Sequence, residues 1–256
     1  MRRLPRRLGY GEEATLVEHL EELRVRIFVM LGALAVATIV AFVFHNRLLN
    51  WLNGPLPAGH KRLATLGVAE PFTVTLTVCV YAGLIISLPV ALWQLWSFFA
   101  PAVEPKVERK VLALVGVATA LGAAGVSFSY FVVLPRAVHW LTNFDDKHFN
   151  HLVQAKSYYS FVVTIMLGMV LVFELPLVVL GLVQLGVLTS ARLRKNRRLG
   201  YFIVAVVALG LPGPDLYTTL LELLPMWALF ESSIWLAVFV ERRQPAPNEP
   251  AGEALL

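Results

Sequence analysis

Two carboxylates in the sequence stand where apolar stretches begin, and they are the side chains best placed to bind a cationic ligand. Glu22 lies in the stretch EATLVEHLEELRVRIF, and Glu108 lies in FFAPAVEPKVERK. Both are predicted at the same face of a membrane, each at the mouth of a spanning helix, so we expect them to converge. A guanidinium can bind a carboxylate through two parallel hydrogen bonds, whereas an ammonium acts as a point charge. Two such glutamates therefore suit a pair of arginines.

The segments around these glutamates predict where their helices begin. Thr15 followed three residues later by Glu18 forms a capping box, which predicts a helix start. Pro101 and Pro105 end one helix and allow the next to begin, because proline disfavours helix in the residue before it and suits a first turn. Glu108 then falls in the first turn of the following helix.

Each glutamate also has an interpretation that needs no ligand. Glu22 and Arg26 have the spacing of an i,i+4 ion pair on a solvated helix face, worth about 0.2–0.5 kcal/mol. Glu108 suits the positive end of a helix dipole, a placement worth about 0.3–1 kcal/mol. Taken alone, neither segment decides between these interpretations and an arginine site.

The composition places these helices in a membrane. Of the 256 residues, 57% are hydrophobic and only 15% are charged, which would leave a soluble domain of this size with large exposed apolar patches. A helix needs roughly 20 apolar residues to cross about 30 Å of hydrocarbon. The fifth apolar run is short and ends before Pro212, so it needs a thinner bilayer or a partner helix. The six predicted spans cover residues 27–44, 72–99, 111–134, 158–188, 199–211 and 216–240.

The basic residues orient these spans. Lys and Arg are enriched in cytoplasmic loops near helix ends, and most of the 22 in this chain fall in the two tails and in the loops around residues 100–110 and 190–198. Both termini are therefore expected in the cytoplasm. The topology also accounts for the net charge of +5, so this charge is no evidence for a nucleic-acid partner. The basic residues of the other face are Arg47, Lys61, Arg62, Arg136, Lys147 and Lys156.

The predicted organisation is one helical domain between two polar tails. Residues 1–14 form a basic cytoplasmic tail, residues 15–240 form the six-helix transmembrane domain, and residues 241–256 form a cytoplasmic tail rich in Pro, Ala and Glu that is expected to be disordered. No apolar signal segment with a cleavage site follows the basic start, so we expect this start to stay on the protein. The single cysteine, Cys79, allows neither an intrachain disulfide nor a thiolate metal cage.

A further carboxylate lies inside a predicted span. Glu174 occurs in FELP, and a charged side chain at the membrane centre costs about 2.5–3.5 kcal/mol on insertion scales, which makes a functional role the default hypothesis. Pro176 lacks an amide hydrogen and frees the carbonyl of Val172, so a kink with a polar notch is expected. Gln94, in LWQLW, either lines the same cavity or makes a contact between helices worth about 0.6 kcal/mol.

Six short motifs, which follow one another over residues 15–240, resemble the TatC family, the multi-spanning subunit of the twin-arginine protein translocase. They are HLEELRVR, AEPF, LPVALWQLWSFFAPAVEPKVERK, FELP, PD and PMWALFE. One departure is LPGPD, where Gly213 replaces one of the two adjacent prolines usual in the family. The resemblance implies an all-α membrane protein, a concave, cup-like bundle of six helices in the cytoplasmic (inner) membrane of a prokaryote, with no enzymatic activity and no cofactor.

The resemblance also implies partners. A protein of this family binds the twin-arginine signal peptides of folded precursor proteins, self-associates in a larger complex within the lipid bilayer, and gathers single-span partners of the TatA and TatB types. Its transport is driven by the protonmotive force.

By resemblance, the candidate residues fall into three predicted sites. The signal-peptide site contains Glu22 and Glu108, with His19, Arg24 and Arg26 of the same motif expected to position the helix and meet phosphates. The site for a single-span partner contains Glu174, Gln94, Pro176 and Glu231. Assembly at the outer face is assigned to Glu70, Pro71, Phe72 and Asp215, although helix capping also explains Glu70 and Asp215. The remaining acidic residue of the last span, Glu222, has no counterpart in the family motifs.

Two other classes of membrane protein share some of these features. A proton-coupled small-molecule transporter also uses intramembrane carboxylates, but paired half-repeats with matching interrupted helices are not visible here. A hydrolase needs a nucleophile beside a base, and neither a GxSxG nor an HExxH motif occurs. A passive membrane scaffold is the remaining alternative, and it predicts indifference to Arg versus Lys in a ligand. No metal site is expected.

Overall fold

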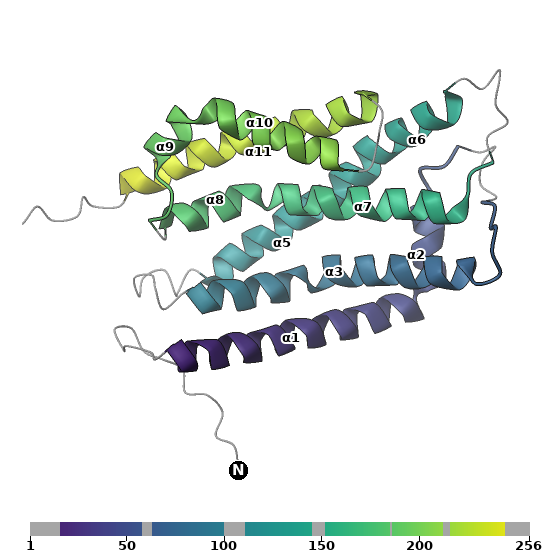
Figure 1. The fold of residues 1–256 in the computed structure, drawn as a ribbon, viewed down its shortest axis with the longest axis horizontal. Coiled ribbons are helices and arrows are strands. Elements are labelled where there is room, and N and C mark those ends of the chain that lie inside the picture. Colours follow the sequence, from purple (N-terminus) through teal and green to yellow (C-terminus); the bar gives the residue numbers. More distant parts are fainter. Residues whose placement is uncertain are drawn as a thin grey trace, which may run out of the picture.

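Long helices that run side by side make up the chain (Figure 1). The computed structural model describes residues 16–57, 63–99, 111–144, 152–184, 186–211 and 216–243. These residues form no β-strand, only an isolated bridge between Ala64 and Gln154. The helices are α1 (Leu16–Val43), α2 (His45–Leu52), α3 (Glu70–Phe99), α5 (Val111–Phe128), the π-helix η3 (Ser129–Val133), α6 (Leu134–Asn143), α7 (Ala155–Phe173), α8 (Leu175–Gln184), α9 (Ser190–Lys195), α10 (Arg197–Gly210) and α11 (Leu216–Arg243).

Five helical stretches of the described residues are long and apolar enough to cross a membrane, and they coincide with all the predicted spans except the fifth. The fifth corresponds to α10, which has 14 residues and at 1.5 Å per residue is about 21 Å long. This is less than the roughly 30 Å of a hydrocarbon core. Helix α10 is therefore too short to cross a bilayer of ordinary thickness, as the short apolar run predicted. The five stretches are Leu20–Val43, Glu70–Phe98, Leu114–Asn143, Ala155–Gln184 and Leu216–Glu241.

The start of α1 and the end of α11 lie at the same end of the bundle, on the left in Figure 1. We call this end, where α1 begins and α11 finishes, the tail end. The opposite end, where α1 finishes and α2 lies, is the loop end. The expectation that the tail end faces the cytoplasm comes from the basic residues.

The helices differ greatly in how far they are covered by the rest of the chain. In Figure 1, α1 lies at the edge of a row that continues through α3 to α7 and α8, while α5 and α6 cross behind this row. In an apolar 18-residue window of α7 and α8, 56% of the residues are buried, whereas the corresponding share in α1 is 11%. Fully buried apolar side chains such as Val162, Ile165 and Met169 place the centre of the core along α7. The apolar surface of α1 is left to lipid or to another protein.

Prolines interrupt the long helices without ending them. The third predicted span stops at 134, but the helix continues through η3 into α6 and ends at Asn143. Pro135 stands in the first turn of α6, where its missing amide hydrogen costs little, and the wider π-turn just before it absorbs the change in hydrogen bonding. The third span is therefore longer than its apolar run.

Glycines set the closest approaches between neighbouring helices. A Cβ at Gly83 of α3 would collide with Thr38 Oγ1 of α1 and would lie 3.0 Å from the Thr38 backbone nitrogen. A Cβ at Gly125 of α5 would lie 3.0 Å from the Met169 carbonyl oxygen of α7. Small residues are the usual means of helix association in a membrane, where burial of apolar surface gives little driving force.

We predict that Gly83→Ala lowers the thermal unfolding temperature of the protein in detergent. The added methyl group must push α1 away from α3, a strain typically worth about 1–3 kcal/mol. Gly32→Ala is the matched control on α1, because a Cβ there meets nothing within 4 Å. Equal unfolding temperatures for the two variants would contradict the close contact.

Candidate functional site

Glu22 lies in the first turns of α1 at the tail end, where its carboxylate is held by Arg26 one turn further on. Glu22 Oε1 accepts hydrogen bonds from both Arg26 Nε, at 3.1 Å, and Arg26 Nη2. The predicted i,i+4 pair is confirmed. The Glu22 side chain is 26% exposed, so a ligand can still reach it.

Arg26 also connects α1 to the end of α3. Its Nη1 donates to the Gln94 carbonyl oxygen at 3.2 Å and to Gln94 Oε1 at 3.3 Å, and its Nη2 donates to the Ser97 carbonyl oxygen at 3.1 Å. Of the two predictions for Gln94, the structure shows the contact between helices. Gln94 is thus assigned to the tail end, next to Glu22.

The other residues of the predicted signal-peptide site are only partly visible. Glu108 lies outside the described residues, and His19 belongs to α1 but its side chain is not among those described. Arg24 places its guanidinium carbon 5.8 Å from the centre of the Phe28 ring, a cation–π contact on the same helix. Convergence of Glu22 with Glu108 therefore stays a prediction.

Glu174 lies between α7 and α8, where the helix is interrupted as Pro176 predicts. The side chain is only 4% exposed, and neither carboxylate oxygen has a hydrogen-bond partner among the described residues. A Cβ at Gly122 of α5 would meet Glu174 Oε1 at 3.4 Å and a Leu88 side-chain carbon at the same distance. The carboxyl group thus faces small and apolar neighbours, a costly position that a polar partner would relieve.

Glu70 connects two segments at the loop end. As the first residue of α3, it accepts hydrogen bonds through Oε2 from the amides of Leu66 at 2.7 Å and Gly67 at 3.1 Å. Through Oε1 it accepts from Gln154 Nε2 at 3.0 Å and from the Lys156 amide at 3.3 Å. Helix capping is therefore confirmed, and the same carboxylate also ties the start of α7 to the start of α3.

The other residues of the predicted outer assembly site have simpler surroundings. Pro71 stands in the first turn of α3, a position that suits proline. The Phe72 side chain is 61% exposed and thus open to lipid or a partner. Asp215 lies outside the described residues.

Three tyrosines at the loop end form hydrogen bonds that the sequence analysis missed. Tyr158 donates to the Leu52 carbonyl oxygen at 2.7 Å, and Tyr130 donates to the Trp51 carbonyl oxygen at 2.8 Å. Tyr159 donates to Asn53 Oδ1 at 2.9 Å. They satisfy the last turn of α2, and aromatic residues near a membrane interface are the only sequence signal that points to them.

Glu231 makes its contacts inside the chain. It accepts a hydrogen bond from the Tyr201 hydroxyl and pairs with Arg197 Nη2 at 3.4 Å, both residues of α10. Its predicted contact with a partner would have to share this carboxylate, which is 29% exposed. Glu222 is buried in α11 at 1% exposure, and nothing in the structure explains its role.

A second tail-end contact fixes the end of α11. Glu241 Oε1 accepts a hydrogen bond from the Ser190 amide at 2.6 Å, and Oε2 accepts one from the Ser190 hydroxyl. The predicted C-terminal tail begins at 241, but α11 continues to Arg243 because Glu241 is held against α9. Residues 244–256 lie outside the described part of the chain.

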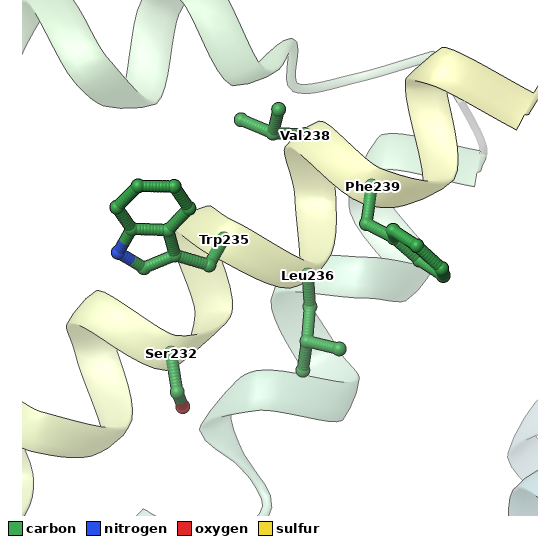
Figure 2. Close-up of a pocket in the computed structure, with 5 residues that line it drawn as sticks. All are labelled: Ser232, Trp235, Leu236, Val238 and Phe239. Carbon is green, nitrogen blue, oxygen red and sulfur yellow. The ribbon is translucent and has the colours of Figure 1, made fainter.

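The outer side of α11 carries a groove (Figure 2), lined by Ser232, Trp235, Leu236, Val238 and Phe239. All five belong to one helix, and most are apolar. Such a groove suits a lipid chain or a helix rather than an enclosed small-molecule substrate. Among the described residues, no group of three or more His, Cys, Asp or Glu could hold a metal ion.

Comparison with known proteins agrees with this architecture. Residues 18–225 match the family model described as TatC, Sec-independent protein translocase protein. The chain belongs to the TatC family.

Relatives in the TatC family span nearly the whole chain. The Sec-independent protein translocase protein TatCd of Bacillus subtilis (strain 168) is 39% identical over 234 residues, which cover 91% of this chain and 95% of the relative. TatC of Carboxydothermus hydrogenoformans is 34% identical over 240 residues, with 93% and 97% covered. A crystal structure of the twin-arginine translocase receptor TatC in DDM superposes with a TM-score of 0.78 at 30% identity, covering 86% of this chain and 99% of that one.

Membership of the TatC family confirms the resemblance found in the sequence motifs. The chain is a component of the Sec-independent protein translocase and a multi-pass membrane protein, and its family is one of membrane receptors rather than enzymes. The structural neighbours also confirm the all-α fold.

We predict that Glu70→Leu speeds amide hydrogen exchange at Leu66, Gly67 and Lys156. The leucine removes the acceptor of these three amides, and a typical hydrogen bond contributes a net stabilisation of about 0.5–1.5 kcal/mol. Hydrogen-exchange mass spectrometry of the detergent-solubilised protein measures the effect. Unchanged exchange in these peptides would show that the carboxylate does not hold the loop end together.

We predict that Glu174→Leu, unlike Glu70→Leu, does not destabilise the protein. Removing a buried carboxyl group that no described residue hydrogen-bonds is expected to leave the thermal unfolding temperature unchanged or to raise it. Glu70→Leu is the matched comparison, since the same substitution there removes a fully hydrogen-bonded carboxylate. A large drop in unfolding temperature for Glu174→Leu would mean that Glu174 has a stabilising partner within the chain.

Proposed function

We propose that this chain is the receptor of a twin-arginine translocase, which binds the paired arginines of signal peptides on folded precursors at the tail end. The observation that carries the proposal is that Glu22, at the mouth of α1, already accepts two hydrogen bonds from a guanidinium. A carboxylate held this way is compatible with an arginine ligand. The solved relative whose title names it a twin-arginine translocase receptor supports the same assignment.

Glu108 is proposed as the second carboxylate of the site. It follows α3 by nine positions in the sequence, and α3 ends next to Glu22, where Arg26 contacts Gln94 and Ser97. The segment that carries Glu108 therefore follows, in the sequence, a helix end that lies next to Glu22. His19 and Arg24 belong to the same α1 motif and are proposed to support the site.

Single-span partners of the TatA and TatB types are proposed to dock along the membrane-facing helices. Glu174 supports this proposal, because a buried carboxylate facing apolar neighbours gains from a polar partner group. Pro176 has no amide hydrogen, so the helix is interrupted beside Glu174. We propose that the complex contains several copies of the chain, that both termini face the cytoplasm of a prokaryotic cell, and that the protonmotive force drives export across the inner membrane.

The domain limits belong to the same proposal. A six-helix domain over residues 15–240 carries the receptor function, and the basic start and acidic, proline-rich end act as cytoplasmic tails. Glu70, Pro71, Phe72 and Asp215 are proposed to organise assembly at the outer face, where Phe72 is the exposed member of the described part of this set.

The decisive experiment measures binding of a twin-arginine signal peptide to the protein in lipid nanodiscs, with a lysine-pair peptide for comparison. We expect Glu22→Ala and Glu108→Ala each to weaken arginine-peptide binding about 10- to 100-fold, because charge-assisted hydrogen bonds contribute about 1.5–3 kcal/mol. The lysine-pair peptide is expected to bind weakly to every variant.

Glu21→Ala is the matched control, since Glu21 is the exposed neighbour of Glu22 and carries the same charge. If wild type and all variants bind both peptides alike, the carboxylates are solvated helix starts and the chain acts as a scaffold. If Glu21→Ala weakens binding as much as Glu22→Ala does, the effect is one of net charge and not of a defined site.

A further inference from the structure

Arg26 is the most connected described side chain at the tail end. Its guanidinium bonds to Glu22 on its own helix and to three acceptors on α3, which are the Gln94 carbonyl oxygen, Gln94 Oε1 and the Ser97 carbonyl oxygen. The side chain is 18% exposed and thus less accessible than Glu22. The sequence analysis expected this arginine to pair with Glu22 and, with His19 and Arg24, to position the helix, but it named no partner on another helix.

The end of α3 needs a donor that its own sequence does not supply. In a continuing helix, the Ser97 carbonyl oxygen would accept from residue 101, but that residue is Pro101, which has no amide hydrogen. The last turn of α3 contains no basic residue. A cation is favourable at the negative end of a helix dipole, and Arg26 brings one from the neighbouring helix. These contacts fix Arg26 whether or not Glu22 is engaged.

The same contacts set the position of α1 along α3. Gly83 meets Thr38 in the middle of the pair, and Arg26 meets Gln94 and Ser97 at the tail end, as two antiparallel helices in register require. The two points are about 17 Å apart along the helix axis at 1.5 Å per residue. The first turns of α1 therefore cannot shift along α3 or move away from it without breaking the hydrogen bonds of Arg26.

The orientation of Glu22 follows from this arrangement. Both bonds from Arg26 go to Oε1, and Oε2 accepts no hydrogen bond from any described residue. One carboxylate oxygen is thus anchored to the α1–α3 pair, while the other is left for an incoming donor. Holding a binding group in place before the ligand arrives lowers the entropy lost on binding.

We propose that Arg26 is a positioning residue for guanidinium recognition, which fixes the carboxylate of Glu22 against the end of α3 before the ligand arrives. The inference rests on the proposed function, since it assumes that Glu22 binds an arginine of the signal peptide. The opposite role, in which Arg26 competes with the peptide for Glu22, would require a side chain that is free to leave. Three of its contacts are to α3 and would not be released with Glu22.

The test is a double-mutant cycle with Glu22→Gln and Arg26→Gln in nanodiscs, measuring Kd for the arginine-pair and lysine-pair peptides. Arg26→Gln is expected to weaken arginine-peptide binding about tenfold and to bring the two peptides closer in affinity. In the Glu22→Gln background, the same change is expected to have no further effect, because Arg26 acts through Glu22. Arg26→Lys, which keeps the charge but not the planar donor array, is expected to recover only part of the lost affinity.

Arg194→Gln is the matched control, because Arg194 is an exposed arginine of α9 and its removal changes the net charge equally. Tighter arginine-peptide binding by Arg26→Gln would show competition and overturn the inference. Additive effects in the cycle, or equal losses for both peptides, would overturn it in favour of a purely structural role. If Glu22→Gln binds the arginine-pair peptide as tightly as wild type, the proposed function itself fails. If Glu22→Gln loses affinity but Arg26→Gln binds as tightly as wild type, only the inference about Arg26 fails.

Discussion

Hydrocarbon offers no hydrogen-bond partners, and this constraint decides where the chain places its polar groups. Backbone groups in a membrane must be satisfied within the protein, so the spans are helices. Side-chain hydrogen bonds between helices then gather at the helix ends, where backbone carbonyls and amides lack partners. Arg26 satisfies the end of α3, Glu70 the segment before α3, and Glu241 the start of α9. Each contact stabilises a helix end and also connects two elements.

Between the helix ends, neighbouring helices are held together mainly by close packing rather than by side-chain hydrogen bonds. Gly83 and Gly125 let neighbouring backbones approach, and apolar side chains along α7 fill the centre. Glu174 differs, because its carboxyl group is buried and neither oxygen is hydrogen-bonded to a described residue. A buried carboxyl group of this kind is retained at a cost, which is a physical reason to connect it with another protein.

The sequence allowed most of the fold to be predicted, because apolar run length and helix-breaking prolines are local signals. The spans, the weak fifth crossing, the break at Glu174 and the Glu22–Arg26 pair all followed from spacing. Contacts between distant residues did not. Nothing local says that Gln94 faces α1, that Tyr158 reaches Leu52, or that Glu241 holds Ser190, since these depend on how helices lie against one another.

Helix boundaries at the ends of spans were also beyond the sequence signals. Composition changes at Glu241, so a tail was expected there, yet a single contact to Ser190 carries α11 to Arg243. The family motif pointed to Glu22 and predicted that Arg26 positions the helix, but the acceptors of Arg26 on α3 became visible only from the structure. The one sequence clue to these acceptors is the proline at position 101.

The edge position of α1 has a consequence for how the protein is made. Helix α1 packs mainly on α3, the next long helix to leave the ribosome, so this hairpin can assemble before the rest of the chain exists. By contrast, α11 is the last of the described helices to be made, and it packs against α8 and α10. The end of α1 that carries Glu22 therefore belongs to the hairpin that forms early, whereas the contact between Ser190 and the final turn of α11 can form only later.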